Sequence, residues 1–592
     1  MTGIDDVLDD LDRWADGRDL TVLAVLGIAA LALVLRFVLL GDRIAHWDEG
    51  RVAYWTLDYL RTGEFHYRFI IHGPFVQIVN RPVFAALGPT DFSARAIVAV
   101  IGGLLPVSAL LLREHLRDVE TVIVAGLLAA NPILLYYSRF FRSSVPVAAF
   151  MFVAFGLFVR AYDTRRPRYV HAGVAFVALG FTAKENAAVY LLVWAGALVL
   201  LLDHELFLPR AVETGFDRLR ALAGRVRARR DDWRSAGSRL ALHAAVAAAL
   251  FALVIAFFYA PRTSDPAGVG LWQAVAHPGR FPALVDAMAA DIVEGYTYWF
   301  GGATDAGCNQ SNVIDGYLCF LGRSLLVLAS YGAVVVPFAL LGFFAERYGA
   351  ERPRRLVTFT SYWGFVSLVG YPLGADIFGA WFLVNVIVPL TVPAAVGLGI
   401  VVRWGEEALE DGDQVSAWIA AAFAALVVAQ LVFAGATGVY ASPQDPENRL
   451  VQFAQPGGDF RAELQAIERA SGSTSGPDVV LYGEWLVDGD AEAERHPPCA
   501  DWFNALPLPW YFAANDWTVE CANNASELDR LLDQEPTAVI VRTGDVHDLP
   551  ETLGASDPFA GYTGESYAIR ASVDPPATEI TIYLREDVAS TA

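Results

Sequence analysis

Lysine is almost absent from this chain of 592 residues, because 42 of its 43 basic residues are arginine and Lys184 is the single exception. Charged residues make up only 18% of the chain, against about 25% in an average soluble protein. Hydrophobic residues make up 55%, and the mean hydropathy is +0.40. This scarcity of charge excludes a purely soluble protein. The retained lysine suggests a need for a compact ammonium, and chance survival of one codon is the alternative.

Cysteine and an N-terminal basic segment are also scarce or missing. The four cysteines form no C-x-x-C pair, which disfavours a zinc site and leaves two disulfides as an expectation in an oxidising compartment; they are Cys308, Cys319, Cys499 and Cys521. Residues 1–19 are rich in aspartate and lack the basic region of a cleavable signal. The first apolar run is therefore expected to remain as an anchor.

The acidic excess is concentrated at the C-terminal end. From Ala441 onward the chain has 27 acidic residues and 8 arginines, so this part carries −19 of the formal net charge of −22. Phosphate binding by nucleic-acid-binding proteins needs clustered Lys and Arg. A nucleic-acid partner is therefore excluded.

Apolar runs of 15 to 22 residues recur along the first three quarters of the chain. A bilayer core of about 30 Å requires helices of roughly this length. The sequence therefore predicts a polytopic α-helical membrane protein with about eleven spans, near residues 20–40, 92–112, 119–137, 145–162, 169–183, 187–202, 240–260, 324–345, 356–371, 381–402 and 415–434.

Arginine-rich loops predict the orientation of these spans. Most of the basic loops fall on one side, which the positive-inside rule makes cytoplasmic. We expect a cell-membrane, multi-pass protein with a cytoplasmic N-terminus (1–19), a transmembrane domain (20–439) with external loops 41–91 and 261–323, and an external acidic domain (440–592). The exception is the first external loop, which carries Arg43, Arg51, Arg61, Arg68 and Arg81.

The acidic C-terminal part is predicted to be a separate α/β domain. Residues 478–482, 538–542 and 578–584 are rich in β-branched and aromatic side chains, which is typical of strands. Residues 460–470 and 526–532 have the pattern of short helices.

The first external loop carries an acidic pair soon after the first span. It reads His46-Trp47-Asp48-Glu49, and a helix with apolar residues at helical spacing is expected to begin here and lie on the bilayer surface. Adjacent carboxylates on a helix point about 100° apart, so one could act as a base and the other as a support. The alternative is that Asp48 is only an N-cap and Glu49 only a favourable charge. His72 in the same loop could support the site or be a surface histidine.

Two further external turns bring cations to the same side. Arg139 and Arg142 lie among aromatic residues and suit a lipid phosphate, and the alternative is that they reach the membrane interface with neighbouring tyrosines. Lys184 and Glu185 occupy the third turn, where they could also form a pair that merely closes a short loop. One carboxylate and a cationic clamp suffice for transfer from a phosphate-linked lipid donor, because the leaving phosphate needs positive charge and the acceptor hydroxyl needs a base.

At these residues the chain resembles the GT-C superfamily of polyprenyl-phosphate-sugar-dependent glycosyltransferases, which includes protein O-mannosyltransferases and aminoarabinose transferases. The resemblance spans about residues 20–202. Segments 46–49, 72–75, 138–142, 184–186 and 507–511 are more narrowly similar to a haloarchaeal group of flippase-activity-associated proteins of the N-glycosylation pathway. Relatives tend to carry an acid where this chain has Ser143-Ser144, and of a late Lys-Thr-Pro-Trp-like run only Trp381 matches.

The resemblance implies an inverting membrane glycosyltransferase that moves a sugar from dolichyl phosphate to a glycan or protein acceptor at the external face. Asp48 is expected to be the base, supported by Glu49 and His46, with Arg139, Arg142 and Lys184 on the donor phosphate and His72, Glu185 and Trp381 in supporting roles. A divalent metal is left open as a cofactor, and no residue is assigned as its ligand. The alternative is a non-catalytic partner that assists translocation of dolichyl-phosphate-linked sugar, against which few ionisable residues lie inside spans.

Overall fold

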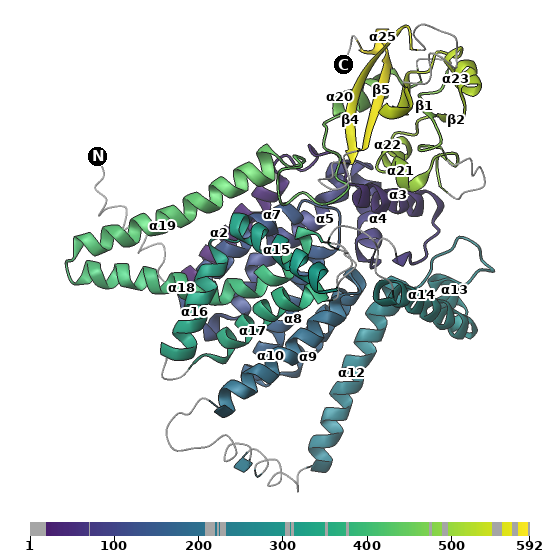
Figure 1. The fold of residues 1–592 in the computed structure, drawn as a ribbon. Coiled ribbons are helices and arrows are strands. Elements are labelled where there is room, and N and C mark those ends of the chain that lie inside the picture. The colour runs from purple at the N-terminus through teal and green to yellow at the C-terminus, as the bar shows by residue number, and fades with distance from the viewer. Residues whose placement is uncertain are drawn as a thin grey trace.

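The computed structural model describes residues 19–69, 72–207, 220–221, 224, 233–301, 308, 313–349, 353–373, 378–472, 476–487, 495–546, 559–570 and 578–589. Within them lies a helical bundle with a smaller sheet domain at one end (Figure 1). The expected cytoplasmic residues 1–18 and most of the arginine-rich stretch 210–232 lie outside the described residues.

Seven helical stretches among the described residues are long and apolar enough to cross a membrane, namely Leu20–Phe37, Asp91–Leu111, Ser144–Thr164, Gly237–Tyr259, Ile314–Tyr331, Ala380–Glu410 and Gln414–Ala441. The other expected spans also fold as helices, but these are shorter or interrupted. Asn131, for example, ends one helix and caps the next, because its side chain accepts from the N–H groups of Ile133 and Leu134. The expected run 324–345 is divided between two helices.

The helices of the bundle and its loops are α2 (Leu20–Phe37), α3 (Trp47–Thr62), α4 (Phe75–Leu87), α5 (Asp91–Leu104), α6 (Asp118–Ala130), α7 (Pro132–Tyr137), α8 (Ser144–Thr164), α9 (Pro167–Ala183), α10 (Ala187–Phe207), α12 (Trp233–Tyr259), α13 (Leu271–Ala276), α14 (Phe281–Gly301), α15 (Val313–Tyr331), α16 (Val335–Phe344), α17 (Arg355–Gly370), α18 (Val384–Glu410) and α19 (Gln414–Gly435).

Helix α18 is the most enclosed of the apolar helices, with 89% of its apolar window buried inside the protein. Glycines allow α16 to cross it closely. A Cβ on Gly342 would lie 1.9 Å from the carbonyl oxygen of Pro393, and one on Gly397 would lie 2.2 Å from that of Phe338. Helix α2, by contrast, exposes much of its apolar surface, as expected of a helix that faces lipid.

The C-terminal domain is the α/β domain that the sequence predicted. Its sheet has the order β2-β1-β3-β5-β4, with β1 parallel to β2 and β3, and β5 antiparallel to β3 and β4. The three expected strands and two expected helices are present, whereas β2 and β4 were not predicted. The elements are α20 (Arg461–Ala470), β1 (Val479–Tyr482), α21 (Trp502–Ala505), α22 (Leu508–Ala514), β2 (Val519–Ala522), α23 (Ala525–Leu532), β3 (Ala538–Arg542), β4 (Tyr562–Arg570), β5 (Thr578–Arg585) and α25 (Glu586–Ala589).

The expected pair of disulfides is confirmed. Cys308 bonds to Cys319, and Cys499 bonds to Cys521. The second bond joins the loop before α21 to β2 and so holds α21 and α22 against the sheet.

Helix α3 lies beneath this domain (Figure 1). The expectation that its apolar residues lie on the bilayer is wrong, because Val52 is 0% exposed and Trp55 and Tyr59 are less than 10% exposed. Helices α4 and α22 cover it. The approach is close because a Cβ on Gly50 would lie 2.8 Å from the Cβ of Pro507.

Replacing Gly50 with alanine should therefore destabilise the contact between α3 and the C-terminal domain. Overpacking of this kind costs about 1–3 kcal/mol of the free energy of unfolding. Thermal unfolding in detergent should show a lower Tm for Gly50→Ala, whereas Gly544→Ala, where a Cβ meets nothing within 4 Å, should match the wild type. Equal Tm values for the two variants would contradict the close packing.

Candidate active site

The first turn of α3 is fixed by a reciprocal cap. The Nδ1 atom of His46 accepts from the N–H of Asp48 at 2.9 Å, and the Glu49 carboxylate accepts from the N–H of His46 at 3.0 Å. This pattern is a capping box with His46 as the N-cap. The alternative role of Asp48 as the N-cap is therefore wrong.

Glu49 is buried and holds four parts of the chain together. Arg95 of α5 donates to its two oxygens at 2.9 and 3.0 Å, Arg43 lies 2.7 Å away, and the N–H of Phe141 donates at 2.7 Å. Burial disfavours the charged carboxylate, but Arg43 and Arg95 outweigh burial and hold the pKa of Glu49 well below its usual range. Glu49 is therefore a permanent anion that positions its neighbours.

Asp48 points away from this cluster and into a cavity. Its Oδ1 lies 2.6 Å from Arg51, its Oδ2 lies 3.3 Å from Arg142, and its side chain is 18% exposed. Burial raises the pKa of Asp48, but Arg142, Arg51, His46 and Lys184 outweigh burial and lower it to about 2. The carboxylate is therefore charged at neutral pH.

Four of the expected site residues line this one cavity. Asp48, Arg142, Lys184 and Trp381 come from α3, the second turn, the third turn and the segment before α18. The remaining lining residues are Tyr137, Phe140, Ser144 and Gln452. The free volume is about 10 Å³, which is room for about one water molecule.

His72 and Glu185 form a second polar cluster next to Lys184. The Nδ1 atom of His72 lies 3.1 Å from Glu185, and the hydroxyl of Tyr67 donates to the same carboxylate at 2.5 Å. Burial raises the pKa of Glu185, and burial with the nearby Lys184 lowers that of His72 well below its usual value. His72 has a left-handed backbone (φ +66°), a strained conformation that its surroundings must maintain. The surface alternative for His72 is wrong, since it is buried.

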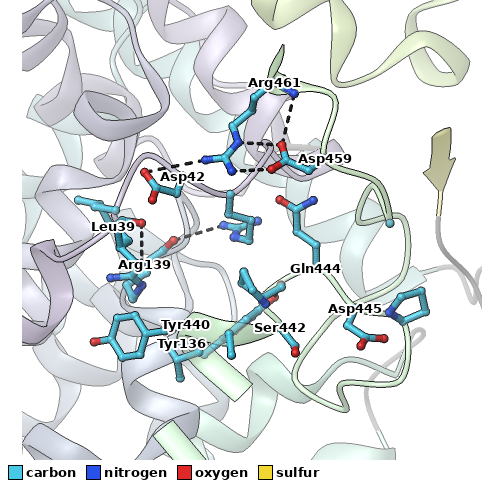
Figure 2. A pocket seen from close by; sticks show the side chains of 17 residues that line it. Leu39, Asp42, Tyr136, Arg139, Tyr440, Ser442, Gln444, Asp445, Asp459 and Arg461 are labelled. Carbon is cyan, nitrogen blue, oxygen red and sulfur yellow. Dashed lines mark hydrogen bonds and ion pairs between the residues drawn. The ribbon is translucent and has the colours of Figure 1, made fainter. Parts of the chain in front are cut away.

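Arg139 is not brought to the cavity. Its guanidinium donates to carbonyl oxygens at the end of α2, which caps that helix, and it stacks on Tyr440 at 4.8 Å. It lines a separate pocket of about 500 Å³, shown in Figure 2, together with Tyr136, Asp42 and Arg461. The end of α7 and the turn after it therefore lie between the two pockets. Tyr136 and Arg139 line the larger one, whereas Tyr137, Phe140 and Arg142 line the cavity of Asp48.

The ring of His46 forms its hydrogen bonds with backbone groups. Because its Nδ1 accepts a hydrogen bond, its Nε2 carries the hydrogen and donates to the carbonyl of Phe453 at 2.6 Å. Burial lowers the pKa of His46 to about 4. The neutral ring thus joins the start of α3 to the segment that follows α19.

The exceptional arginines of the first loop each have a partner. Arg43 pairs with Glu49 and Arg51 with Asp48, whereas Arg61 pairs with Asp516 of the C-terminal domain. The guanidinium carbon of Arg68 lies 3.5 Å from the centre of the Trp55 ring. That of Arg81 lies 4.8 Å from the centre of the Tyr59 ring. The presence of these arginines in an external loop conflicts with the positive-inside rule, and this conflict indicated in the sequence that the loop has a special role. No sequence pattern indicated that Arg95 or Gln452 belongs to the site.

A divalent metal does not fit this cavity. Asp48 is the one carboxylate among its lining residues, and Arg142 and Lys184 face it. In the part of the chain that the structure describes, no group of three or more His, Cys, Asp and Glu residues lies close enough to hold a metal ion.

The arrangement of helices is that of the GT-C glycosyltransferases. The structure of ArnT from Cupriavidus metallidurans bound to undecaprenyl phosphate is 16% identical and has a TM-score of 0.51, with 94% of this chain and 97% of that chain covered. The apo structure of the same protein is 15% identical with the same coverage and a TM-score of 0.50. The archaeal oligosaccharyltransferase AglB from Archaeoglobus fulgidus is 14% identical, with 97% and 75% coverage and a TM-score of 0.48.

Two segments also match family models. Residues 72–211 match "Dolichyl-phosphate-mannose-protein mannosyltransferase", and residues 460–585 match "Agl23 flippase-associated protein C-terminal domain". None of the curated proteins matches this chain. The resemblance predicted from the sequence is confirmed: the chain has the GT-C fold, and residues 460–585 are similar to the Agl23 flippase-associated C-terminal domain.

The buried, neutral His46 should make the protein less stable in mild acid. An unfolded histidine has a pKa of about 6.5, above the folded value of about 4, so the unfolded chain binds the proton first and stability falls as pH drops from about 6.5 to 4. The loss is about 3 kcal/mol. His46→Asn keeps an N-cap acceptor and should show a smaller fall in Tm over this pH range. Parallel pH profiles for both proteins would refute this role.

Proposed function

We propose that this chain is an inverting membrane glycosyltransferase that moves a sugar from a dolichyl (polyprenyl) phosphate donor to a protein or glycan acceptor, in protein glycosylation. The observation that carries this proposal is the cavity that joins one carboxylate, Asp48, to two cations, Arg142 and Lys184. The match of residues 72–211 to a dolichyl-phosphate-mannose-dependent family supports the donor class. The undecaprenyl phosphate bound to ArnT supports it further.

Arg142 and Lys184 hold the donor phosphate in this proposal. A guanidinium and an ammonium that line the cavity stabilise the charge that develops on the leaving phosphate. Arg142 is paired with Asp48 in this structure. Donor binding would draw Arg142 toward the phosphate and remove one of the cations that lower the pKa of Asp48.

Asp48 is the base. Its carboxylate accepts the proton of the acceptor hydroxyl, whose oxygen forms a bond to C1 of the sugar while the bond from C1 to the phosphate oxygen breaks. The electron pair leaves with the lipid phosphate. A carboxylate with a pKa of about 2 is a weak base, so the shift of Arg142 toward the donor is what raises its basicity.

The residues around Asp48 position it rather than react. Glu49 and His46 fix the first turn of α3, and the cluster of His72 and Glu185 fixes the turn that carries Lys184. Trp381 and Phe140 enclose the cavity. Since the free volume fits about one water molecule, donor entry requires a local opening that then closes around the sugar.

In this proposal the cavity and the C-terminal domain face the outside of the cell, and the N-terminus is cytoplasmic. The orientation rests on the arginine-rich loops between spans. The C-terminal domain covers α3, so it is placed to select the acceptor.

A second candidate is a non-catalytic partner in translocation of the lipid-linked sugar. The match of residues 460–585 to a flippase-associated domain favours it. In that case the cavity would bind the same donor without cleaving it, and transfer by the purified protein would be absent.

Asp48→Asn should abolish sugar transfer, because the amide cannot accept the proton. We expect a loss of at least 100-fold in kcat, in keeping with the usual contribution of a general base of about 10²–10⁴. The measurement is transfer from radiolabelled dolichyl-phosphate sugar by purified protein. Asp58→Asn on the same helix is the control and should keep wild-type activity. Undiminished transfer by Asp48→Asn would contradict the proposed mechanism.

Substitutions of Lys184 and of Arg139 should have different effects on donor binding and on stability. Lys184→Gln removes a cation from the cavity and should raise the KM for the donor about tenfold or more. Arg139→Gln should leave that KM within about twofold and lower the Tm instead, because Arg139 caps α2. Donor kinetics and thermal unfolding of both variants decide this, and a raised donor KM in Arg139→Gln would show that the assignment is wrong.

A further inference from the structure

Gln452 lines the cavity from an unexpected part of the chain. It lies in the segment that connects the last apolar helix to the C-terminal domain, yet it lines the same cavity as Asp48, Arg142 and Lys184. It is 6% exposed. Its side-chain amide forms no hydrogen bond with any of the described residues.

The backbone around Gln452 is held on both sides by the elements of the site. The hydroxyl of Tyr137 donates to the carbonyl of Leu450 at 2.6 Å, and His46 donates to that of Phe453 at 2.6 Å. Arg43, the partner of Glu49, donates to the side chain of Gln455 at 2.7 Å. Gln452 therefore keeps a fixed place relative to Asp48, which is the preorganisation that a binding residue requires.

The chemistry of the amide points to hydroxyl groups. An amide at a cavity that has no partner among the described residues is available for hydrogen bonds with a ligand. A carboxamide is neutral and both donates and accepts, as a sugar hydroxyl does. The phosphate of the donor already has Arg142 and Lys184, so the neutral amide suits the part of the donor next to the phosphate.

We propose that Gln452 is a specificity-determining residue that hydrogen-bonds to hydroxyls of the transferred sugar. This inference rests on the proposed donor class and adds the group that recognises the sugar. It assigns to the segment between the last helix and the C-terminal domain a direct share in donor recognition. Removal of the amide weakens binding of the sugar and leaves binding of the lipid phosphate unchanged.

The test compares two lipids on one protein. Equilibrium binding of dolichyl phosphate and of dolichyl phosphate carrying mannose or glucose is measured for the full-length wild type, Gln452→Ala and Gln452→Met. Methionine keeps the length of the side chain without the amide, so it guards against a cavity effect of alanine. Gln465→Ala, at an exposed glutamine of α20, is the matched control.

We expect both Gln452 variants to lose about tenfold in affinity for the preferred sugar-bearing lipid and less than twofold for dolichyl phosphate, with Gln465→Ala equal to the wild type. Equal losses for both lipids, no loss for either, or a wild type that gains no affinity from either sugar would each overturn the proposal. The readout does not need turnover. A wild type that binds with this pattern but transfers no sugar would refute the proposed catalysis and still support the role of Gln452.

Discussion

The buried carboxylate of Glu49 is the interaction on which the rest of the site depends. It binds two arginines and two backbone N–H groups, and these come from the first loop, the start of α3, helix α5 and the turn after α7. Removal of one member of such a buried cluster leaves the opposite charges buried without a partner, which lowers the free energy of unfolding by several kcal/mol. Because adjacent side chains on a helix diverge by about 100°, fixing Glu49 also fixes the direction of Asp48.

Hydrogen bonds next to this cluster connect the bundle to the C-terminal domain. Tyr511 of α22 accepts from the N–H of Ala45 at 2.8 Å and donates to Asp91 at 2.8 Å, and Trp510 donates to the same Asp91 at 2.9 Å. The chain between Arg43 and Asp48 therefore lies between α5, the C-terminal domain and the segment before that domain. These contacts couple the position of Asp48 to that of the C-terminal domain.

The sequence predicted what depends on local pattern and failed where packing decides. Apolar length predicted the spans, and the β-rich runs predicted β1, β3 and β5. The acidic pair, the arginine-bearing turn and the single lysine predicted three residues of one cavity, because consecutive turns on one side of a bundle lie close together, and the family resemblance added Trp381. Arg139 and Arg142 are three residues apart on a tight turn, and no local pattern shows which of them faces the cavity. Gln452 is about 270 positions from Lys184, so only the tertiary fold brings them together.

The proposed function requires that the cavity of Asp48, and not the larger pocket beside Arg139, receives the donor phosphate. A structure of the full-length protein with dolichyl phosphate bound tests this most directly. We expect a phosphate between Arg142 and Lys184, with Arg142 turned away from Asp48 and toward the phosphate. A phosphate bound in the pocket lined by Arg139 and Tyr440, with the pair of Arg142 and Asp48 intact, would contradict it.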